Sequence, residues 1–322
     1  MSELPEVAPV AIAGGGSIGV AFALVFARAG LPVRIWDPDA ARRAAIPGEV
    51  RGRLDDLGGY GLLAEPADAI LGRVTVLEDL TDAVAGVQHV QECAPERVEL
   101  KQALFAELDR LAPPAATLAS SSSFLPASSF AAELPGRGRC MVAHPGNPPY
   151  LIPVIEIVPA PFTDEAAARR AEALFTRAGL TPVRVRQEVE GFIFNRLQGA
   201  LLREAYCLVR DGVASVEDVD RVVRDGLGRR WAHIGPFETA DLNTRGGIAA
   251  HAERMGPSYA RMGAERGQND PWTPELVAQV ERERRALLPA EEWEARVAWR
   301  DRALMADLKA RQGRTRTDGP AG

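Results

Sequence analysis

The sequence predicts an α/β protein with a doubly wound, mostly parallel sheet, followed by an all-helical C-terminal domain. Two observations carry this prediction. Short apolar runs alternate with amphipathic helical segments up to about residue 190, and such alternation is typical of a parallel sheet with helices on both faces. From Gly191 onward the strand-like runs stop, while helical patterns continue. We therefore expect the sheet domain over residues 1–190 and the helical domain over residues 191–322.

Short apolar runs mark the expected strands. In chain order they cover residues 7–13, 31–36, 74–77, 87–93, 116–120, 140–143, 154–158 and 182–185. The helical segments between them include residues 20–29, 95–111 and 164–178, with Thr163 as the expected N-cap of the last. After Asp37 a helical pattern is broken at Gly58-Gly59-Tyr60-Gly61, which predicts a helical hairpin.

Amphipathic segments make up the expected helical domain, residues 191–322. A helix is expected over residues 192–209, and Ser215-Val216-Glu217-Asp218 has the form of a capping box that opens another. Thr273-Pro274-Glu275 opens a third, and residues 291–310 form the last, with Trp293, Trp299 and Leu304 on its apolar side. Apolar faces on such helices favour a homodimer.

The composition excludes several classes of protein. Of 322 residues, 46% are hydrophobic and 25% charged, with a net charge of −6, as in ordinary globular enzymes. No basic face is concentrated enough to indicate a nucleic-acid partner. Three cysteines without paired spacing argue against disulfides or a metal site, and we expect a cytoplasmic protein. The apolar run 7–27 follows two glutamates and is broken by glycines, so neither a signal peptide nor a membrane span is expected.

A glycine-rich turn lies between the first strand and the first helix. It reads Gly14-Gly15-Gly16-Ser17-Ile18-Gly19, a G-x-G-x-x-G pattern. The first glycine permits a tight turn, the second lets the backbone approach a pyrophosphate, and the third allows close packing of helix on strand. Asp37 ends the second strand, where a carboxylate can accept hydrogen bonds from the adenine ribose and repel a 2′-phosphate. The pattern predicts a Rossmann-type domain that binds NAD.

A histidine and a glutamate form the candidate catalytic pair. His144 lies in a proline-rich turn, and Glu156 is the only charge in the apolar run 151–158 that follows. A carboxylate buried there without a partner would cost several kcal/mol, so an imidazole from the preceding turn is the expected partner. The alternative is a buried ion pair without chemistry.

Several segments together resemble the 3-hydroxyacyl-CoA dehydrogenase superfamily, and within it the lambda-crystallin and L-gulonate 3-dehydrogenase branch. The resemblance rests on the glycine turn with Asp37 and on the runs 91–96, 120–123, 144–150, 191–196 and 226–239. The run 226–239 is the one most specific to the sugar-acid branch. The members of this superfamily that act on 3-hydroxyacyl-CoA commonly have Ser-Asn-Thr-Ser and His-Phe-Phe-Asn-Pro where this chain has Ser120-Ser121-Ser122-Ser123 and His144-Pro145-Gly146-Asn147-Pro148. The resemblance therefore implies the chemistry but not a thioester preference.

The resemblance implies a role for each matching residue. His144 would be the general base, and Glu156 would orient its ring. Ser123 and Asn195 would hydrogen-bond the reacting oxygen. The expected cofactor contacts are Gly14, Gly16, Ser17, Ile18, Gly19, Asp37, Ala94, Glu96 and Lys101, with the last two along the nicotinamide ribose. The expected substrate contacts are Ser123, Asn147, Asn195 and Arg230.

Some of these residues have structural alternatives. Ser123 could be a turn serine, Asn195 a helix cap, Lys101 a solvated helix lysine and Arg230 a surface arginine. Arg229 competes with Arg230 for the substrate carboxylate, which a guanidinium fork suits.

The sequence thus predicts an NAD-dependent dehydrogenase that oxidises the 3-hydroxyl of a small hydroxy acid, with L-gulonate as the leading substrate. A short-chain 3-hydroxyacyl-CoA dehydrogenase and a carnitine dehydrogenase are the enzymatic alternatives. A crystallin-like structural protein without turnover is the non-enzymatic one.

Overall fold

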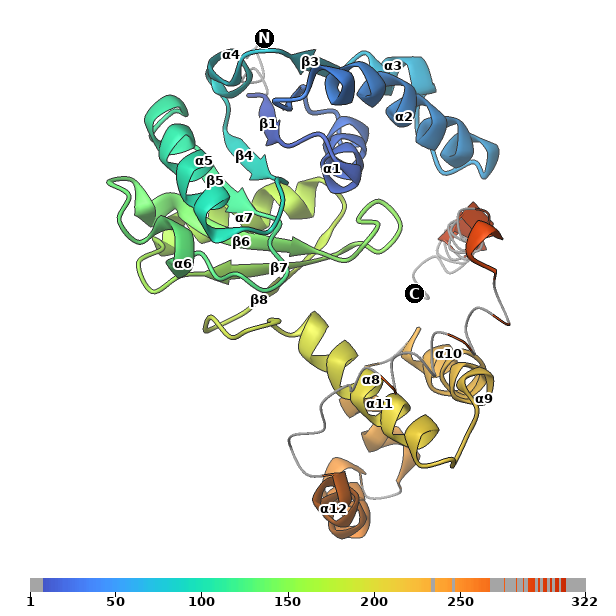
Figure 1. Cartoon of the computed structure of the whole chain (residues 1–322). Coiled ribbons are helices and arrows are strands. Elements are labelled where there is room, and N and C mark those ends of the chain that lie inside the picture. The colour runs from blue at the N-terminus through green and yellow to red at the C-terminus, as the bar shows by residue number, and fades with distance from the viewer. Residues whose placement is uncertain are drawn as a thin grey trace, which may run out of the picture. The chain divides into compact units, whose positions relative to one another are not determined.

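The computed structural model describes residues 8–232, 235–244 and 247–266, together with separate positions between 275 and 310. By contacts the chain divides into two units (Figure 1): Met1–Arg196 with Val297–Gly322 form the first, and Leu197–Arg296 form the second. The first unit ends inside a helix, six residues beyond the expected boundary at residue 190. The C-terminal segment groups with the sheet, whereas the sequence places it in the helical domain. The helix expected from Thr273, and the side chains of Trp293 and Leu304, lie outside the described residues.

An eight-stranded sheet forms the first unit. Its order is β3-β2-β1-β4-β5-β6-β7-β8, and every pairing is parallel except that of β6 with β7. The strands are β1 Val10–Ala13, β2 Val33–Trp36, β3 Val74–Leu77, β4 His89–Glu92, β5 Thr117–Ser120, β6 Cys140–Pro145, β7 Val154–Pro159 and β8 Thr181–Arg184. Each overlaps an expected strand. The order reverses between β1 and β4, where doubly wound sheets bind ligands.

Helices cover both faces of this sheet. They are α1 Ser17–Arg28, α2 Ala40–Gly59, α3 Ala67–Leu71, α4 Leu80–Val84, α5 Val98–Leu111, α6 Ser128–Ala131 and α7 Glu165–Arg177. Helices α1, α2, α3 and α7 pack in one apolar cluster and α4, α5 and α6 in another, with β1 contributing alternate residues to each. The two clusters confirm the doubly wound fold, and α2 with α3 forms the expected hairpin.

The start of α7 differs from the prediction. Its N-cap is Asp164, and Thr163 lies one residue outside the helix. The Thr163 hydroxyl instead donates to the Cys140 carbonyl at 2.6 Å and accepts the Ala160 N–H at 2.8 Å. The threonine is therefore used to join the loop before α7 to the start of β6.

The second unit is helical. After α8 Phe194–Arg210, which begins in the first unit, it contains α9 Val216–Arg221, a π-helical turn Val222–Leu227, α10 Gly228–Trp231, α11 Pro236–Asn243 and α12 Gly247–Arg266. Ser215 caps α9, accepting the Asp218 N–H at 3.1 Å as the capping box predicts. Arg266 pairs with Glu204 at 2.9 Å and with Asp211, which ties α12 to α8.

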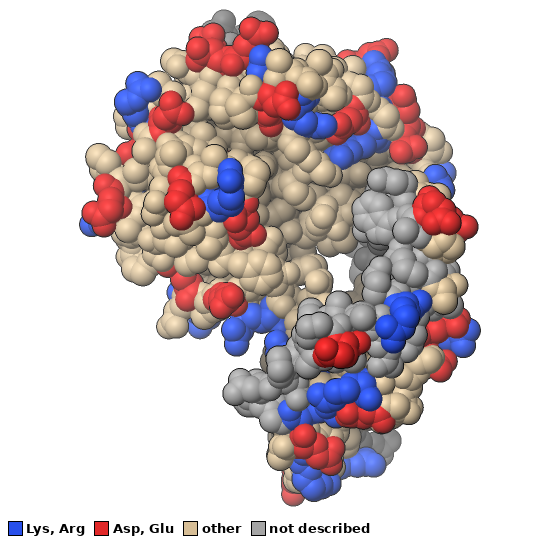
Figure 2. All heavy atoms as spheres, in the orientation of Figure 1, with Lys and Arg blue, Asp and Glu red and all other residues tan. Residues whose placement is uncertain are grey.

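Charged side chains of both signs are interspersed over the face of the sheet unit drawn in Figure 2. No helix among the described residues is both long enough and apolar enough to cross a membrane. Within the same residues, no group of three or more His, Cys, Asp or Glu side chains could hold a metal ion.

Candidate active site and cofactor cleft

The imidazole of His144 and the carboxylate of Glu156 lie side by side on adjacent strands. His144 is in β6 itself, one residue before its end, and it is the register partner of Glu156 in the antiparallel strand β7. His144 Nδ1 is 2.7 Å from Glu156 Oε2, and both side chains are buried. The twelve positions between His144 and Glu156 thus span the β6–β7 hairpin, which brings Glu156 opposite His144.

The second oxygen of Glu156 binds the start of α8. Oε1 accepts the backbone N–H of Ile193 at 2.7 Å and of Phe194 at 3.0 Å, where the helix dipole favours a negative charge. Gly191 and Phe192 enter the helix with φ of 75° and 49°, a left-handed turn that aims these N–H groups at the carboxylate. One carboxylate therefore fixes both the imidazole and the first turn of α8.

Two phenylalanines hold the histidine ring. Its centroid lies 5.7 Å from that of Phe192 and 6.2 Å from that of Phe194. With Nδ1 bound to Glu156, Nε2 has no hydrogen-bond partner among the described residues. The pair is arranged so that Nε2 can accept a proton while the carboxylate stabilises the resulting imidazolium.

Ser123 and Asn195 meet beside this pair. Asn195 lies in the first turn of α8 and donates its Nδ2 to the backbone carbonyl of Ser123 at 3.2 Å. The Ser123 hydroxyl has no partner among the described residues. Asn195 thus ties the serine loop to α8, as an inter-element bridge would, and leaves the hydroxyl of Ser123 free.

Glu96 organises the serine loop. Its Oε1 accepts the N–H groups of Ser123, Phe124 and Leu125 at 2.7–3.1 Å and the hydroxyl of Ser122. Burial acts to raise the pKa of this carboxyl, but the hydrogen bonds outweigh it and hold the pKa below its ordinary value. All of these bonds go to one oxygen, so Oε2 stays available for a hydroxyl donor.

Lys101 is buried, with 1% of its surface exposed. Its Nζ lies 2.7 Å and 2.9 Å from the two carboxylate oxygens of Glu92, and it also donates to Ser120 Oγ at 3.2 Å and the Ala94 carbonyl at 3.4 Å. The solvated-lysine alternative is therefore wrong. In this structure Lys101 anchors the loop after β4, and its contact with the nicotinamide ribose stays a prediction.

Glu92 is a buried carboxylate beside the cofactor cleft that the sequence did not single out. It is fully buried at the end of β4, accepts the Ala94 N–H at 2.6 Å and neutralises Lys101. In the sequence it is a charged residue at the end of an apolar strand with a lysine nine positions later, a pattern that a solvated pair would share.

The glycine turn lies where the first strand meets the first helix. Gly14 has φ of 112°, and a Cβ there would lie 2.7 Å from the backbone carbon of Cys93. A Cβ at Gly19 would lie 1.9 Å from the Gly14 carbonyl oxygen, so only glycine allows this approach of α1 to the turn. Gly16 is the N-cap of α1 and supplies no side-chain cap, which leaves the N–H groups of the first turn, from Ser17 and Ile18 on, open to an anion.

Asp37 stands at the end of β2, next to this turn. Its Oδ2 accepts the Gly15 N–H at 2.7 Å, and its Oδ1 accepts the Asp39 N–H at 2.9 Å. Each oxygen keeps one lone pair for a ribose hydroxyl. Arg42 donates its Nε to the Gly15 carbonyl at 2.6 Å, while its buried Nη2 has no partner among the described residues.

A cavity of about 770 Å³ opens over these groups. Its lining includes Gly14, Gly16, Asp37, Arg42 and Ala94. Glycine backbone, an uncapped helix N-terminus, a carboxylate and an apolar wall are what a dinucleotide requires. The residues present therefore fit NAD, and the expected cofactor residues around the turn are brought together.

No hydrogen bond or ion pair among the described residues joins the remaining predicted residues to those above. Asn147 is exposed in the loop between β6 and β7. Arg229 and Arg230 are exposed on α10, in the second unit. His233 lies outside the described residues, and His89 is a buried core histidine that contacts Thr117 and Gln91.

A Rossmann sheet with this cleft and a carboxylate-supported histidine defines the class of nicotinamide-dependent dehydrogenases. Two protein-family models match the sequence. The model of the NAD-binding domain of 3-hydroxyacyl-CoA dehydrogenase matches residues 9–189, and the model of its C-terminal domain matches residues 191–287. The chain belongs to the 3-hydroxyacyl-CoA dehydrogenase family. It is an NAD-dependent oxidoreductase of a family that acts on secondary hydroxyl groups.

Relatives of known name align over most of the chain. The lambda-crystallin homolog of Bos taurus is 41% identical over 306 residues, covering 93% of this chain and 95% of the relative. L-carnitine dehydrogenase of Streptomyces griseus is 40% identical over 277 residues, covering 83% and 77%. Among solved structures, the 5-formyl-3-hydroxy-2-methylpyridine 4-carboxylic acid 5-dehydrogenase, an NAD+-dependent dismutase, has a TM-score of 0.83 at 28% identity, covering 96% and 99%.

Proposed function

We propose that this protein oxidises the 3-hydroxyl of a small free hydroxy acid with NAD+, and that L-gulonate is its leading substrate. The observation that carries the proposal is the buried contact of 2.7 Å between His144 Nδ1 and Glu156 Oε2. It fixes the imidazole tautomer and leaves Nε2 to act as a base.

The residues of the site divide the work of alcohol oxidation. His144 Nε2 takes the hydroxyl proton, and Glu156 stabilises the imidazolium that forms. The hydroxyl of Ser123 donates a hydrogen bond to the reacting oxygen as negative charge develops there, and Asn195 holds the serine loop in place. NAD+, when bound, would accept the hydride from the carbon that carries this hydroxyl. The cofactor binds in the cavity beside the glycine turn. The carboxylate of Asp37 in this cavity repels a 2′-phosphate and therefore favours NAD over NADP.

Three features favour a free acid over an acyl-CoA thioester. The lambda-crystallin homolog aligns over nearly the whole chain at 41% identity. The serine run and the His-Pro-Gly-Asn-Pro segment depart from the usual acyl-CoA pattern. Arg230 is exposed on α10, and we assign its guanidinium to the substrate carboxylate.

A substrate panel tests the proposal. NAD+ reduction is measured with L-gulonate, 3-hydroxybutyrate, carnitine and 3-hydroxybutyryl-CoA, and kcat/KM is compared. We expect L-gulonate or another free hydroxy acid to lead, and Arg230→Ala to raise its KM. A uniform preference for the thioester contradicts the free-acid proposal. Unchanged kinetics of Arg230→Ala toward every hydroxy acid contradict the carboxylate contact.

Carnitine oxidation is the second candidate, because a carnitine dehydrogenase aligns at 40% identity. A trimethylammonium group would require aromatic and acidic walls, and the carnitine arm of the panel tests whether the site supplies them. Turnover of any substrate in the panel would exclude a purely structural, crystallin-like role.

A homodimer completes the proposal. The helical unit exposes large apolar side chains: Leu197, Val213, Val222, Phe237 and Leu242 are each more than 55% exposed. A second copy of the chain would bury such faces. Sedimentation velocity of the purified protein should give a dimer, and a monomer at micromolar concentration would contradict it.

A further inference from the structure

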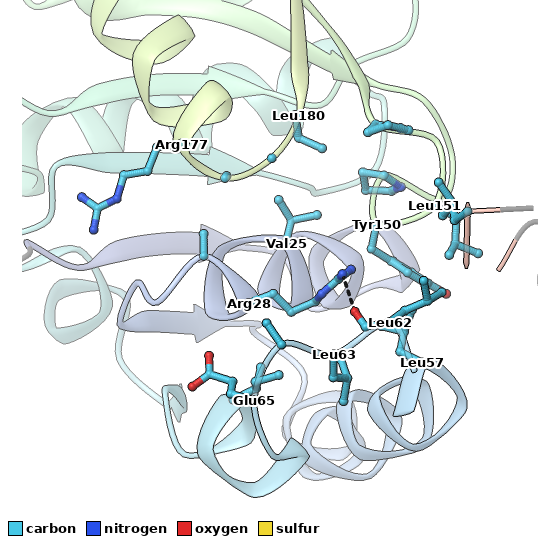
Figure 3. A pocket seen from close by; sticks show the side chains of 18 of the residues that line it. Val25, Arg28, Leu57, Leu62, Leu63, Glu65, Tyr150, Leu151, Arg177 and Leu180 are labelled. Carbon is cyan, nitrogen blue, oxygen red and sulfur yellow. Dashed lines mark hydrogen bonds between the residues drawn. The ribbon is translucent and has the colours of Figure 1, made fainter. Parts of the chain in front are cut away.

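A second cavity, of about 480 Å³, lies in the first unit (Figure 3). It is bounded by the C-terminal half of α1, the α2–α3 connection, the loop before β7 and the α7–β8 turn. Its lining combines aliphatic side chains, among them Val25, Leu57, Leu62, Leu151 and Leu180, with the charged side chains of Arg28, Glu65 and Arg177. None of the residues assigned above to the catalytic site or the cofactor cleft lines it, so it belongs to neither.

The arginine Arg28 projects into this cavity among the aliphatic side chains. Figure 3 shows its guanidinium in the midst of the lining side chains, where it donates one hydrogen bond from Nη2 to the Leu62 carbonyl at 3.0 Å. The side chain is partly buried, and this burial lowers the pKa of Arg28. The guanidinium stays charged, but it has lost hydration that one carbonyl does not replace.

No carboxylate among the described residues neutralises Arg28. Glu65 also lines the cavity, but both of its oxygens bind Arg73, at 2.5 Å and 2.6 Å. Arg177 adds a second positive charge at the rim, where its side chain is exposed and points away from Arg28. The cavity therefore has a positive charge without a counterion inside an aliphatic wall.

We propose that this cavity binds a small monocarboxylate with an apolar body, whose carboxylate pairs with Arg28. A carboxylate matches the guanidinium donors that are free, and the aliphatic walls match a short acyl or aryl chain. A phosphate fits less well, because Arg177, the other arginine of the lining, points away from Arg28 and does not face the same ligand group.

Calorimetric titration of the intact protein tests the site. The probes are hexanoate and its uncharged analogue hexanamide, with saturating NADH present. We expect saturable binding of hexanoate and at least roughly tenfold weaker binding of hexanamide, since a charge-assisted pair shielded from water contributes about 1.5–3 kcal/mol. Absence of saturable hexanoate binding up to about 10 mM, the weak limit for a small-ligand site, overturns the proposal.

Three variants locate the binding. Arg28→Met keeps the length and removes the charge, and we expect it to weaken hexanoate roughly 10- to 100-fold. Arg177→Met, the matched exposed arginine at the rim, should change the affinity less than threefold. Arg230→Ala reports binding at the proposed substrate site, and loss of hexanoate binding in this variant with retention in Arg28→Met would overturn the assignment.

The melting temperature of the ligand-free protein separates a binding role from a structural one. If Arg28 is kept for a ligand, Arg28→Met removes an uncompensated charge and should melt at the wild-type temperature or above it. A lower melting temperature together with unchanged hexanoate affinity would show that Arg28 serves only to hold the Leu62 carbonyl. If Arg28→Met does not fold, Arg28→Lys replaces it, and equal affinity for hexanoate and hexanamide in that variant overturns the proposal.

Discussion

Replacing Glu156 by glutamine tests how the carboxylate controls the histidine. In the native protein Oε1 accepts two backbone N–H groups and Oε2 contacts His144 Nδ1. The amide oxygen of glutamine will face the two N–H donors, which leaves its NH2 group facing Nδ1. Nδ1 must then accept, so the proton moves to Nε2 and the imidazole can no longer act as a base. Loss of the charge-assisted bond alone costs about 1.5–3 kcal/mol.

We therefore expect Glu156→Gln to lower kcat at least ~100-fold at neutral pH. NAD+ reduction with the best substrate of the panel measures this effect, and NADH fluorescence measures cofactor binding, which should be unchanged. Glu188→Gln is the matched control, because Glu188 accepts a backbone N–H from Ser128 at 3.0 Å without touching a histidine. A Glu156→Gln enzyme within threefold of wild-type kcat would refute the reasoning.

Three further predictions concern the cofactor cleft and the core. Asp37→Asn removes the charge that repels a 2′-phosphate, so NADPH affinity measured by fluorescence should approach that of NADH; an unchanged preference would contradict the role of Asp37. Lys101→Met leaves Glu92 buried without its counterion and should lower the free energy of unfolding in urea by about 3–5 kcal/mol, and a loss below about 1 kcal/mol would contradict this. Burial lowers the pKa of His89 from 6.5 to about 4, so the unfolded chain takes up a proton first as pH falls. The free energy of unfolding of the wild type should therefore fall by roughly 3 kcal/mol more than that of His89→Gln between pH 6.5 and pH 4. If the two proteins lose stability equally over this range, His89 is not the titrating group.

The sequence predicts the sheet and the catalytic pair because both leave local signals. Parallel strands buried on both faces are short apolar runs, and a single glutamate inside such a run requires a partner. The register that places His144 opposite Glu156 is set by the hairpin between β6 and β7, and the sequence indicated a turn histidine instead. His144 and Glu156 are in contact as expected, but His144 lies in strand β6 and not in the turn after it.

The supporting contacts could not be predicted, because they join elements that are distant in the sequence. Glu92 and Lys101 pair across a loop and a helix turn, and Glu96 binds N–H groups 27 to 29 residues away. Polar residues that follow apolar strands carry no signal that distinguishes a buried pair from a solvated one. The same reason explains why Arg28, a single arginine at the end of an apolar helix, has no distinctive sequence pattern.

The most direct test of the account is the turnover of His144→Ala with NAD+ and the best hydroxy acid of the panel. Removing the imidazole should lower kcat at least ~1000-fold, because the base itself is lost, while NADH binding stays near wild type. The melting temperature should fall, because the buried Glu156 carboxylate loses one partner and keeps only its two backbone N–H donors, so kcat is measured well below that temperature. A His144→Ala enzyme that keeps a tenth or more of wild-type kcat would show that the proton leaves by another route and would contradict the account.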